Sequence, residues 1–165
     1  MTAYRLDDPK VARIDRMRYA KNTFSSRLTY LAILFNVLYF VSIYESDVGS
    51  WYYQILIGGS IVYNLVFMLM TFLASEGVKN YKLGYSVLLI VAGAMQVGRI
   101  FFLPMQAYKA TVTISKVKYP VMDQSQLIWV IICLALSAAC CFVAGVVGII
   151  RSRKLAAYNA SLNEQ

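Results

Sequence analysis

Four long runs of apolar residues divide the chain, and short polar or charged segments separate them. The runs cover residues 28–44, 51–74, 83–104 and 127–150. A transmembrane helix needs about 20 apolar residues, because each residue adds about 1.5 Å and the hydrocarbon layer is about 30 Å thick. The pattern therefore predicts an all-α integral membrane protein, built as a bundle of four transmembrane helices.

The spacing of the runs also predicts the domain organisation. Residues 1–27 form a basic amphipathic segment, residues 28–150 form the transmembrane domain, and residues 151–165 form a polar tail. The connections are too short for a separate soluble domain. The sequence Ser42-Ile43-Tyr44-Glu45 offers no small-x-small cleavage site, so we expect the first run to remain as a membrane helix rather than act as a signal peptide.

Composition agrees with this class and removes several kinds of chemistry. The chain is 59% hydrophobic and 15% charged, whereas soluble domains are roughly half apolar and a quarter charged. It has no histidine, which is the commonest metal ligand and general base. Its three cysteines all lie in the fourth run, where cysteine behaves as a small hydrophobe. We therefore expect no metal, no cofactor and no enzymatic activity.

The distribution of Lys and Arg predicts the orientation. Seven precede the first run, two lie between the second and third runs, and three follow the fourth. Cytoplasmic loops carry an excess of such residues. Both ends are therefore predicted to be cytoplasmic in a multi-pass protein of the plasma (inner) membrane. This bias also explains most of the +8 net charge, so we do not expect nucleic-acid binding.

The segment before the first run has the spacing of an amphipathic helix. Val11, Ile14 and Met17 recur at helical intervals, with basic residues between them. This pattern predicts an interfacial helix that lies on the inner leaflet and is attracted to anionic lipid. Two alternatives are a solvated basic segment that only follows the positive-inside rule, and a docking site for a cytoplasmic partner. The predicted inner-leaflet basic face consists of Arg13, Arg16, Arg18 and Lys21.

The external connection, residues 105–126, is longer than the others. Between residues 111 and 119, Thr and Ser alternate with Val and Ile, which is a strand-like pattern. An extended edge or hairpin there would invite pairing with another chain. An irregular loop is the alternative.

The fourth run is rich in small residues that fall on one helical face. Such residues allow helix backbones to approach closely, so this face is predicted to pack against another helix, either of the same chain or of a partner. The face consists of Cys133, Ser137, Cys141, Ala144 and Gly148.

A set of polar residues inside the runs is the main candidate site. Asn36 and Asn64 lie near the middle of the first and second runs, while Gln96 and Arg99 share a face of the third. Polar side chains are costly in a membrane, so they usually face the interior of a bundle.

This polar set has two interpretations. In the structural one, the three amides bond between helices, and Arg99 extends outward to form an ion pair with Glu45 or Asp47, or to meet phosphate. In the functional one, Gln96 and Arg99 line a cavity and bind an anionic solute or lipid headgroup, since the planar guanidinium can donate two parallel hydrogen bonds.

Two functions follow from these features, and a third is weaker. The first is a non-catalytic accessory or scaffold subunit that packs beside another membrane subunit or forms a homo-oligomer. The second is a small channel or transporter for an anionic solute or lipid headgroup, because no run contains an interior Asp or Glu for cation coupling. A membrane enzyme acting on lipid or quinone is disfavoured by the lack of histidine and of paired acids.

Overall fold

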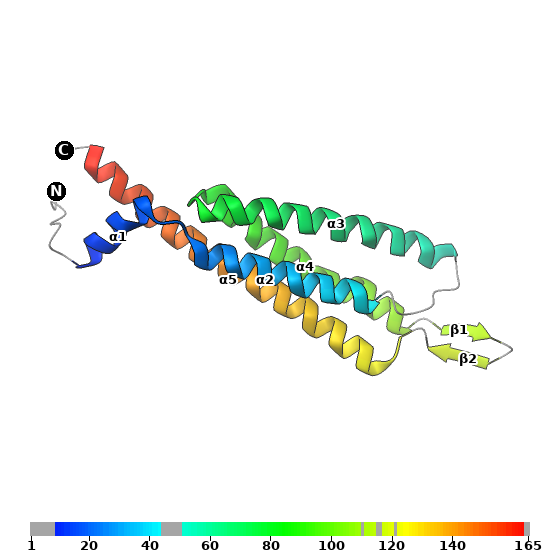
Figure 1. Ribbon diagram of the computed structural model, residues 1–165. Helices are drawn as coiled ribbons and strands as arrows, with labels where there is room; N and C mark the ends of the chain where they lie inside the picture. Colours follow the sequence, from blue (N-terminus) through cyan, green and yellow to red (C-terminus); the bar gives the residue numbers. More distant parts are fainter. Residues whose placement is uncertain (1–8, 44–50, 110, 115–116, 121, 164–165) are drawn as a thin grey trace.

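The computed structural model describes residues 9–43, 51–109, 111–114, 117–120 and 122–163 (Figure 1). Four of its helices are long and apolar enough to cross a membrane, which confirms the predicted four-helix membrane bundle. The elements in chain order are α1 (Pro9–Tyr19), α2 (Thr23–Ile43), α3 (Trp51–Lys79), α4 (Leu83–Lys109), β1 (Thr111–Ile114), β2 (Val117–Pro120) and α5 (Gln124–Asn163).

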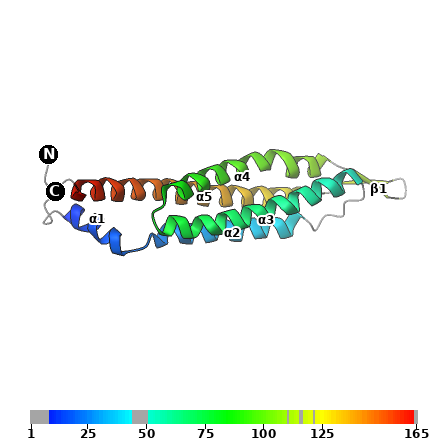
Figure 2. The same cartoon turned by 90° about the horizontal axis from the view of Figure 1, so that it is seen from above.

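The four long helices run lengthwise beside one another and form an elongated bundle (Figure 2). Helix α5 packs against α2 and α4, and α3 packs against the other sides of the same two helices. In cross-section the order around the bundle is therefore α3, α2, α5, α4. The two-stranded sheet lies at one end, and α1 and the end of α5 lie at the other (Figure 1).

The helices extend beyond the apolar runs that predicted them. Helix α4 continues through Pro104 to Lys109, and α5 continues past residue 150 to Asn163. Hydropathy marks only the part of a helix that suits a membrane. The helix itself is formed by backbone hydrogen bonds, and it continues wherever helix-forming residues follow. At about 1.5 Å per residue, the 40 residues of α5 span about 60 Å, twice the hydrocarbon thickness.

Helix α1 packs against the extension of α5 instead of standing alone. Its residue Val11 is buried. The hydroxyl of Tyr158, on the extension, donates a hydrogen bond to Asp15 on α1 at 3.1 Å. The segment predicted to be helical is therefore helical, and part of its apolar side is covered by protein. The predicted basic face is exposed at all four positions: Arg13, Arg16, Arg18 and Lys21.

The connection after α4 contains an antiparallel hairpin. Strand β1 pairs with β2 in a register that places Thr111 opposite Pro120 and Ile114 opposite Val117. Of the two alternatives for this connection, the structure has the hairpin.

Asp123 is the N-cap of α5. Its backbone carbonyl accepts the first helical hydrogen bond, from Leu127 N–H at 3.0 Å, and a hydrogen bond from the Ser125 hydroxyl lowers the pKa of its carboxyl.

The small-residue face of α5 is buried against helices of the same chain. Cys133, Ser137, Cys141 and Ala144 are each at most 1% exposed. Gly148 lies where a Cβ atom would collide with Ser86 on α4, and a Cβ at Gly145 would come within 2.8 Å of the Ser86 backbone oxygen. The packing partner that the sequence left open is therefore α4, together with α2.

Because this approach is so close, adding a single methyl group should separate α4 from α5. In Gly145→Ala, the new Cβ would also lie 2.7 Å from Ile90 Cγ1. We expect the free energy of unfolding in detergent to fall by about 1–3 kcal/mol, the usual effect of overpacking.

The matched control is Gly98→Ala on α4, because nothing lies within 4 Å of a Cβ at that position. It should leave stability unchanged or raise it by up to about 1 kcal/mol, since Ala favours helix more than Gly does. Denaturant unfolding followed by circular dichroism measures both variants. Equal stability of the two would contradict this packing.

Candidate functional site

Helix α4 places two strongly polar side chains in the interior of the bundle. Gln96 is fully buried and Arg99 is 8% exposed. Residues three apart on a helix lie on the same face, so both side chains are directed toward the other helices rather than toward lipid. They form two neighbouring polar layers.

The Arg99 layer joins α4 to α3 and α2. Arg99 Nη1 donates to Asn64 Oδ1 at 2.8 Å, and Nη2 donates to Ser60 Oγ at 2.9 Å. The guanidinium carbon lies 4.3 Å from the ring centroid of Tyr39 and 4.6 Å from that of Tyr63. The cation is therefore hydrogen-bonded at its edge and has an aromatic ring close to it from each of two helices.

The Gln96 layer joins α4 to α2 and α5. Gln96 Nε2 donates to Asn36 Oδ1 at 2.8 Å and, at 3.5 Å, to Ser137 Oγ. The Ser137 hydroxyl in turn donates to the backbone carbonyl of Ala32 at 2.9 Å. Gln96 and Arg99 together thus contact all three of the other long helices.

Further polar contacts hold the end of the bundle near α1. The hydroxyls of Ser26 on α2 and Ser75 on α3 are 2.8 Å apart. Asn22 is the N-cap of α2, and its backbone N–H donates to the carbonyl of Lys79 at 2.9 Å, where α3 ends. Arg151 Nη1 on α5 donates to Asn22 Oδ1 at 2.7 Å. One asparagine therefore connects three helices.

These contacts make the buried charge tolerable. A charged group in a low-dielectric interior is strongly unfavourable unless it is paired and hydrogen-bonded. A cation over an aromatic face gains about 2 kcal/mol or more when both are desolvated, and a hydrogen bond to a charged group about 1.5–3 kcal/mol. With two aromatic and two hydrogen-bonding partners, Arg99 stabilises the arrangement of helices that surrounds it.

The amides bond between helices as the structural interpretation expects. Gln96 meets Asn36, and Asn64 meets Arg99, in each case from another helix. The expected ion-pair partners of Arg99, Glu45 and Asp47, lie outside the described residues, so that pairing stays a prediction. The contacts seen here lie within the bundle rather than at its surface.

The polar cluster retains some hydrogen-bonding capacity. Among the described residues, Asn36 Nδ2, Asn64 Nδ2, Gln96 Oε1 and the Tyr63 hydroxyl are buried and have no hydrogen-bond partner. Two of these atoms are amide donors: Asn64 Nδ2 belongs to the Arg99 layer and Asn36 Nδ2 to the neighbouring Gln96 layer. An anion or a water molecule would be the natural complement to these donors.

Sequence reasoning missed the two tyrosines of this site. Tyr39 lies three residues after Asn36, on the same helical face, and Tyr63 is adjacent to Asn64. Tyrosine is common in membrane helices, especially at the membrane interface, so its presence in a run does not by itself indicate a site. Spacing from Asn36 was a usable signal for Tyr39. The contact of Tyr63 with Arg99 could not be predicted without knowing the relative rotation of α3 and α4.

The described part of the chain contains no cluster of acidic, Cys or His side chains suited to a metal ion. Its three cysteines are free thiols, and Cys133 and Cys141 are buried in the core. No protein-family model matches the sequence, and neither curated proteins nor solved structures give a match. The function of the chain is therefore inferred from its own geometry.

Replacing Arg99 should destabilise the bundle. In Arg99→Ala, the partners on α2 and α3 lose the cation while remaining buried, so we expect the free energy of unfolding to fall by about 3 kcal/mol or more. Arg99→Lys should recover only a small part of the loss, because an ammonium lacks the planar fork that reaches two acceptors at once.

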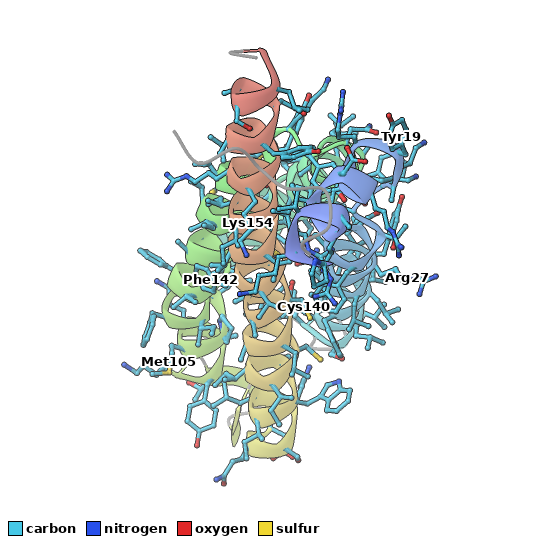
Figure 3. All side chains as sticks on the ribbon, turned by 90° about the vertical axis from the view of Figure 1, so that its left-hand side faces the viewer. Tyr19, Arg27, Met105, Cys140, Phe142 and Lys154 are labelled. Carbon is cyan, nitrogen blue, oxygen red and sulfur yellow. The ribbon has the colours of Figure 1, made fainter. Side chains whose placement is uncertain are left out.

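The control is Arg27→Ala on α2, whose side chain points away from the bundle (Figure 3). It should change stability by less than about 0.5 kcal/mol, as is usual for surface substitutions. Denaturant unfolding in detergent measures all three variants. If Arg99→Ala were as stable as Arg27→Ala, the structural role of the cluster would be wrong.

Proposed function

We propose that this four-helix membrane protein is a non-catalytic accessory or scaffold subunit, which joins a larger membrane complex or assembles with copies of itself. The proposal is supported by the contacts that the intramembrane polar groups make with one another. Arg99 donates to Asn64 and Ser60 and lies close to two tyrosine rings. The Arg99 guanidinium, the only charged group of the bundle interior in the described part of the chain, thus holds helices together. A subunit that catalyses no reaction needs its polar groups for this purpose alone.

The hairpin offers a surface for such an assembly. In the described part of the chain the sheet has two strands only, β1 and β2, so each has an outer edge that no third strand covers. Exposed strand edges pair readily with an extended segment of another chain. We propose that a partner subunit, or a second copy, adds a strand here. The positive-inside bias supports a plasma (inner) membrane location with the hairpin outside and both ends in the cytoplasm.

Native mass spectrometry of the protein, extracted from its own membranes in a mild detergent, tests the subunit role. We expect a stoichiometric second protein or a defined homo-oligomer. Replacing residues 111–120 by a Gly-Ser linker of equal length should remove that partner. The same replacement should leave the helical circular dichroism signal of the bundle intact, because the hairpin lies outside the bundle.

Two results would count against this proposal. A monomer that retains no partner in any detergent would exclude a stable subunit. Retention of the partner after replacement of the hairpin would move the contact to the helices.

The second candidate is a small channel or transporter for an anionic solute or lipid headgroup. Two buried donors without a partner favour it: Asn64 Nδ2, on the side chain that accepts from Arg99, and Asn36 Nδ2, on the side chain that accepts from Gln96. Anion flux in proteoliposomes should then exceed that of protein-free vesicles. It should also fall at least about tenfold in Asn64→Leu, which removes the donor and is similar in size; tenfold corresponds to about 1.4 kcal/mol. Flux at the protein-free level would leave the accessory role as the only candidate.

A further inference from the structure

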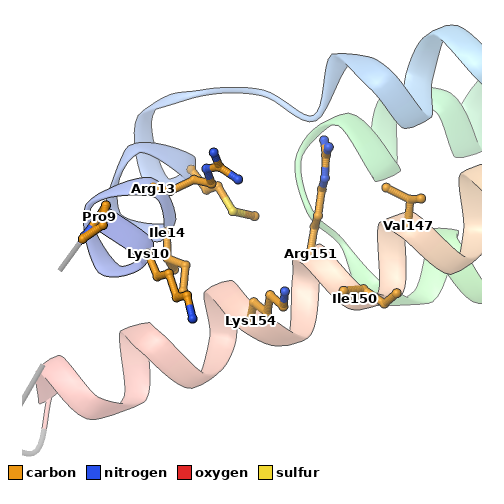
Figure 4. Close-up of a pocket in the computed structure, with 9 residues that line it drawn as sticks. Pro9, Lys10, Arg13, Ile14, Val147, Ile150, Arg151 and Lys154 are labelled. Atoms are coloured by element: carbon orange, nitrogen blue, oxygen red, sulfur yellow. The ribbon is translucent and has the colours of Figure 1, made fainter.

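A basic groove lies between α1 and the extension of α5, away from the Arg99 cluster (Figure 4). Its cavity has a volume of about 660 Å³. Four cationic side chains line it, and none of the described residues that line it is acidic: Lys10 and Arg13 come from α1, and Arg151 and Lys154 come from α5. Like charges gathered around one groove repel one another, so the arrangement favours an anionic occupant.

Arg151 is positioned in advance for such a ligand. Its Nη1 donates to Asn22 Oδ1, and its guanidinium carbon lies 5.7 Å from the ring centroid of Phe24. These contacts hold the guanidinium in place without neutralising it. Arginine is well suited to phosphate because its planar N–H groups match phosphate oxygens.

The rest of the groove is apolar and leads toward the membrane. It is lined by Ile14 and Met17 on α1 and by Val147 and Ile150 on α5. Ile150 is the last residue of the apolar run of α5, so the adjacent Arg151 marks the level where headgroups begin. Val143, Val147 and Ile150 recur at helical spacing, and Val143 and Ile150 are exposed, which provides an apolar stripe from the groove down the helix.

We propose that this groove binds one anionic phospholipid. The phosphate lies among the four cations, and an acyl chain follows the stripe formed by Val143, Val147 and Ile150. A soluble anion would use only the cations, and an acidic protein segment would not require an apolar path into the bilayer. The site is separate from the intramembrane cluster and does not depend on the accessory role.

The test is binding of phosphatidylglycerol to the purified full-length chain in a neutral detergent, measured by native mass spectrometry and by the rise in Tm. Phosphatidylcholine with the same acyl chains is the comparison lipid. We expect one tightly bound phosphatidylglycerol, a clear rise in Tm and much weaker retention of phosphatidylcholine, since a ligand that binds only the folded state stabilises it.

A double variant, Arg13→Gln with Lys154→Gln, removes one cation from each wall of the groove. The loss of two charge-assisted contacts should weaken phosphatidylglycerol binding about tenfold or more. The matched control is Arg16→Gln with Arg153→Gln. It removes the same net charge from the same two helices, at exposed positions that do not line the groove, and should bind phosphatidylglycerol as the unaltered protein does.

Four results would overturn the proposal. Equal weakening in the control variant would show general attraction to a basic surface, and equal retention of phosphatidylcholine would show a purely apolar groove. Full displacement of the lipid by millimolar inorganic phosphate would identify a soluble-anion site. Absence of a bound phosphatidylglycerol would leave the groove to an acidic protein segment. Because neither Arg13 nor Lys154 makes a hydrogen bond in the described structure, the variants should fold normally, and an unchanged lipid-free Tm verifies this.

Discussion

The arrangement of the helices depends on the buried guanidinium of Arg99 and on the amide of Gln96 one turn before it. In a membrane, lipid tails are as apolar as leucine side chains, so hydrophobicity alone does not choose which helices meet or how they are rotated. A polar group in hydrocarbon is different, because it is strongly unfavourable until it finds a partner. Gln96 finds its partners on α2 and α5, and Arg99 finds its partners on α3 and α2. The rotation of α4 is therefore determined by two residues, and the other three helices are oriented by contact with them.

Close packing completes what the polar contacts begin. Helix α5 presents Gly145 and Gly148 to Ser86 and Ile90 on α4 so closely that no Cβ fits. Dispersion forces between two backbones at that distance replace the hydrophobic drive that a soluble bundle would have. The two kinds of contact are complementary. The polar layers specify which faces meet, while the small residues allow the helices to approach.

The surfaces with functional potential lie at the two ends of the molecule. At one end, the hairpin has strand edges that no strand in the described part of the chain covers. At the other, α1 lies against α5 and forms a groove lined by four cations just above the last apolar turn. The middle of the bundle is given over to holding the helices together. The polar, closely packed centre of this small membrane protein is thus separate from the two ends, where contact with a partner and with lipid is proposed.

The sequence alone determined the class of the protein. About 20 consecutive apolar residues are typical of a transmembrane helix, and four such runs specify four membrane crossings. It also identified Asn36, Asn64, Gln96 and Arg99, since polar residues in such runs must face inward. The tertiary structure decided what those residues contact. Tyr39 and Tyr63 flank Arg99, and Arg13 and Lys154 line one groove, only because particular helices are neighbours at particular rotations. Periodicity along one helix defines a face but not the helix opposite it, so contacts between residues far apart in the chain follow from the fold and not from spacing.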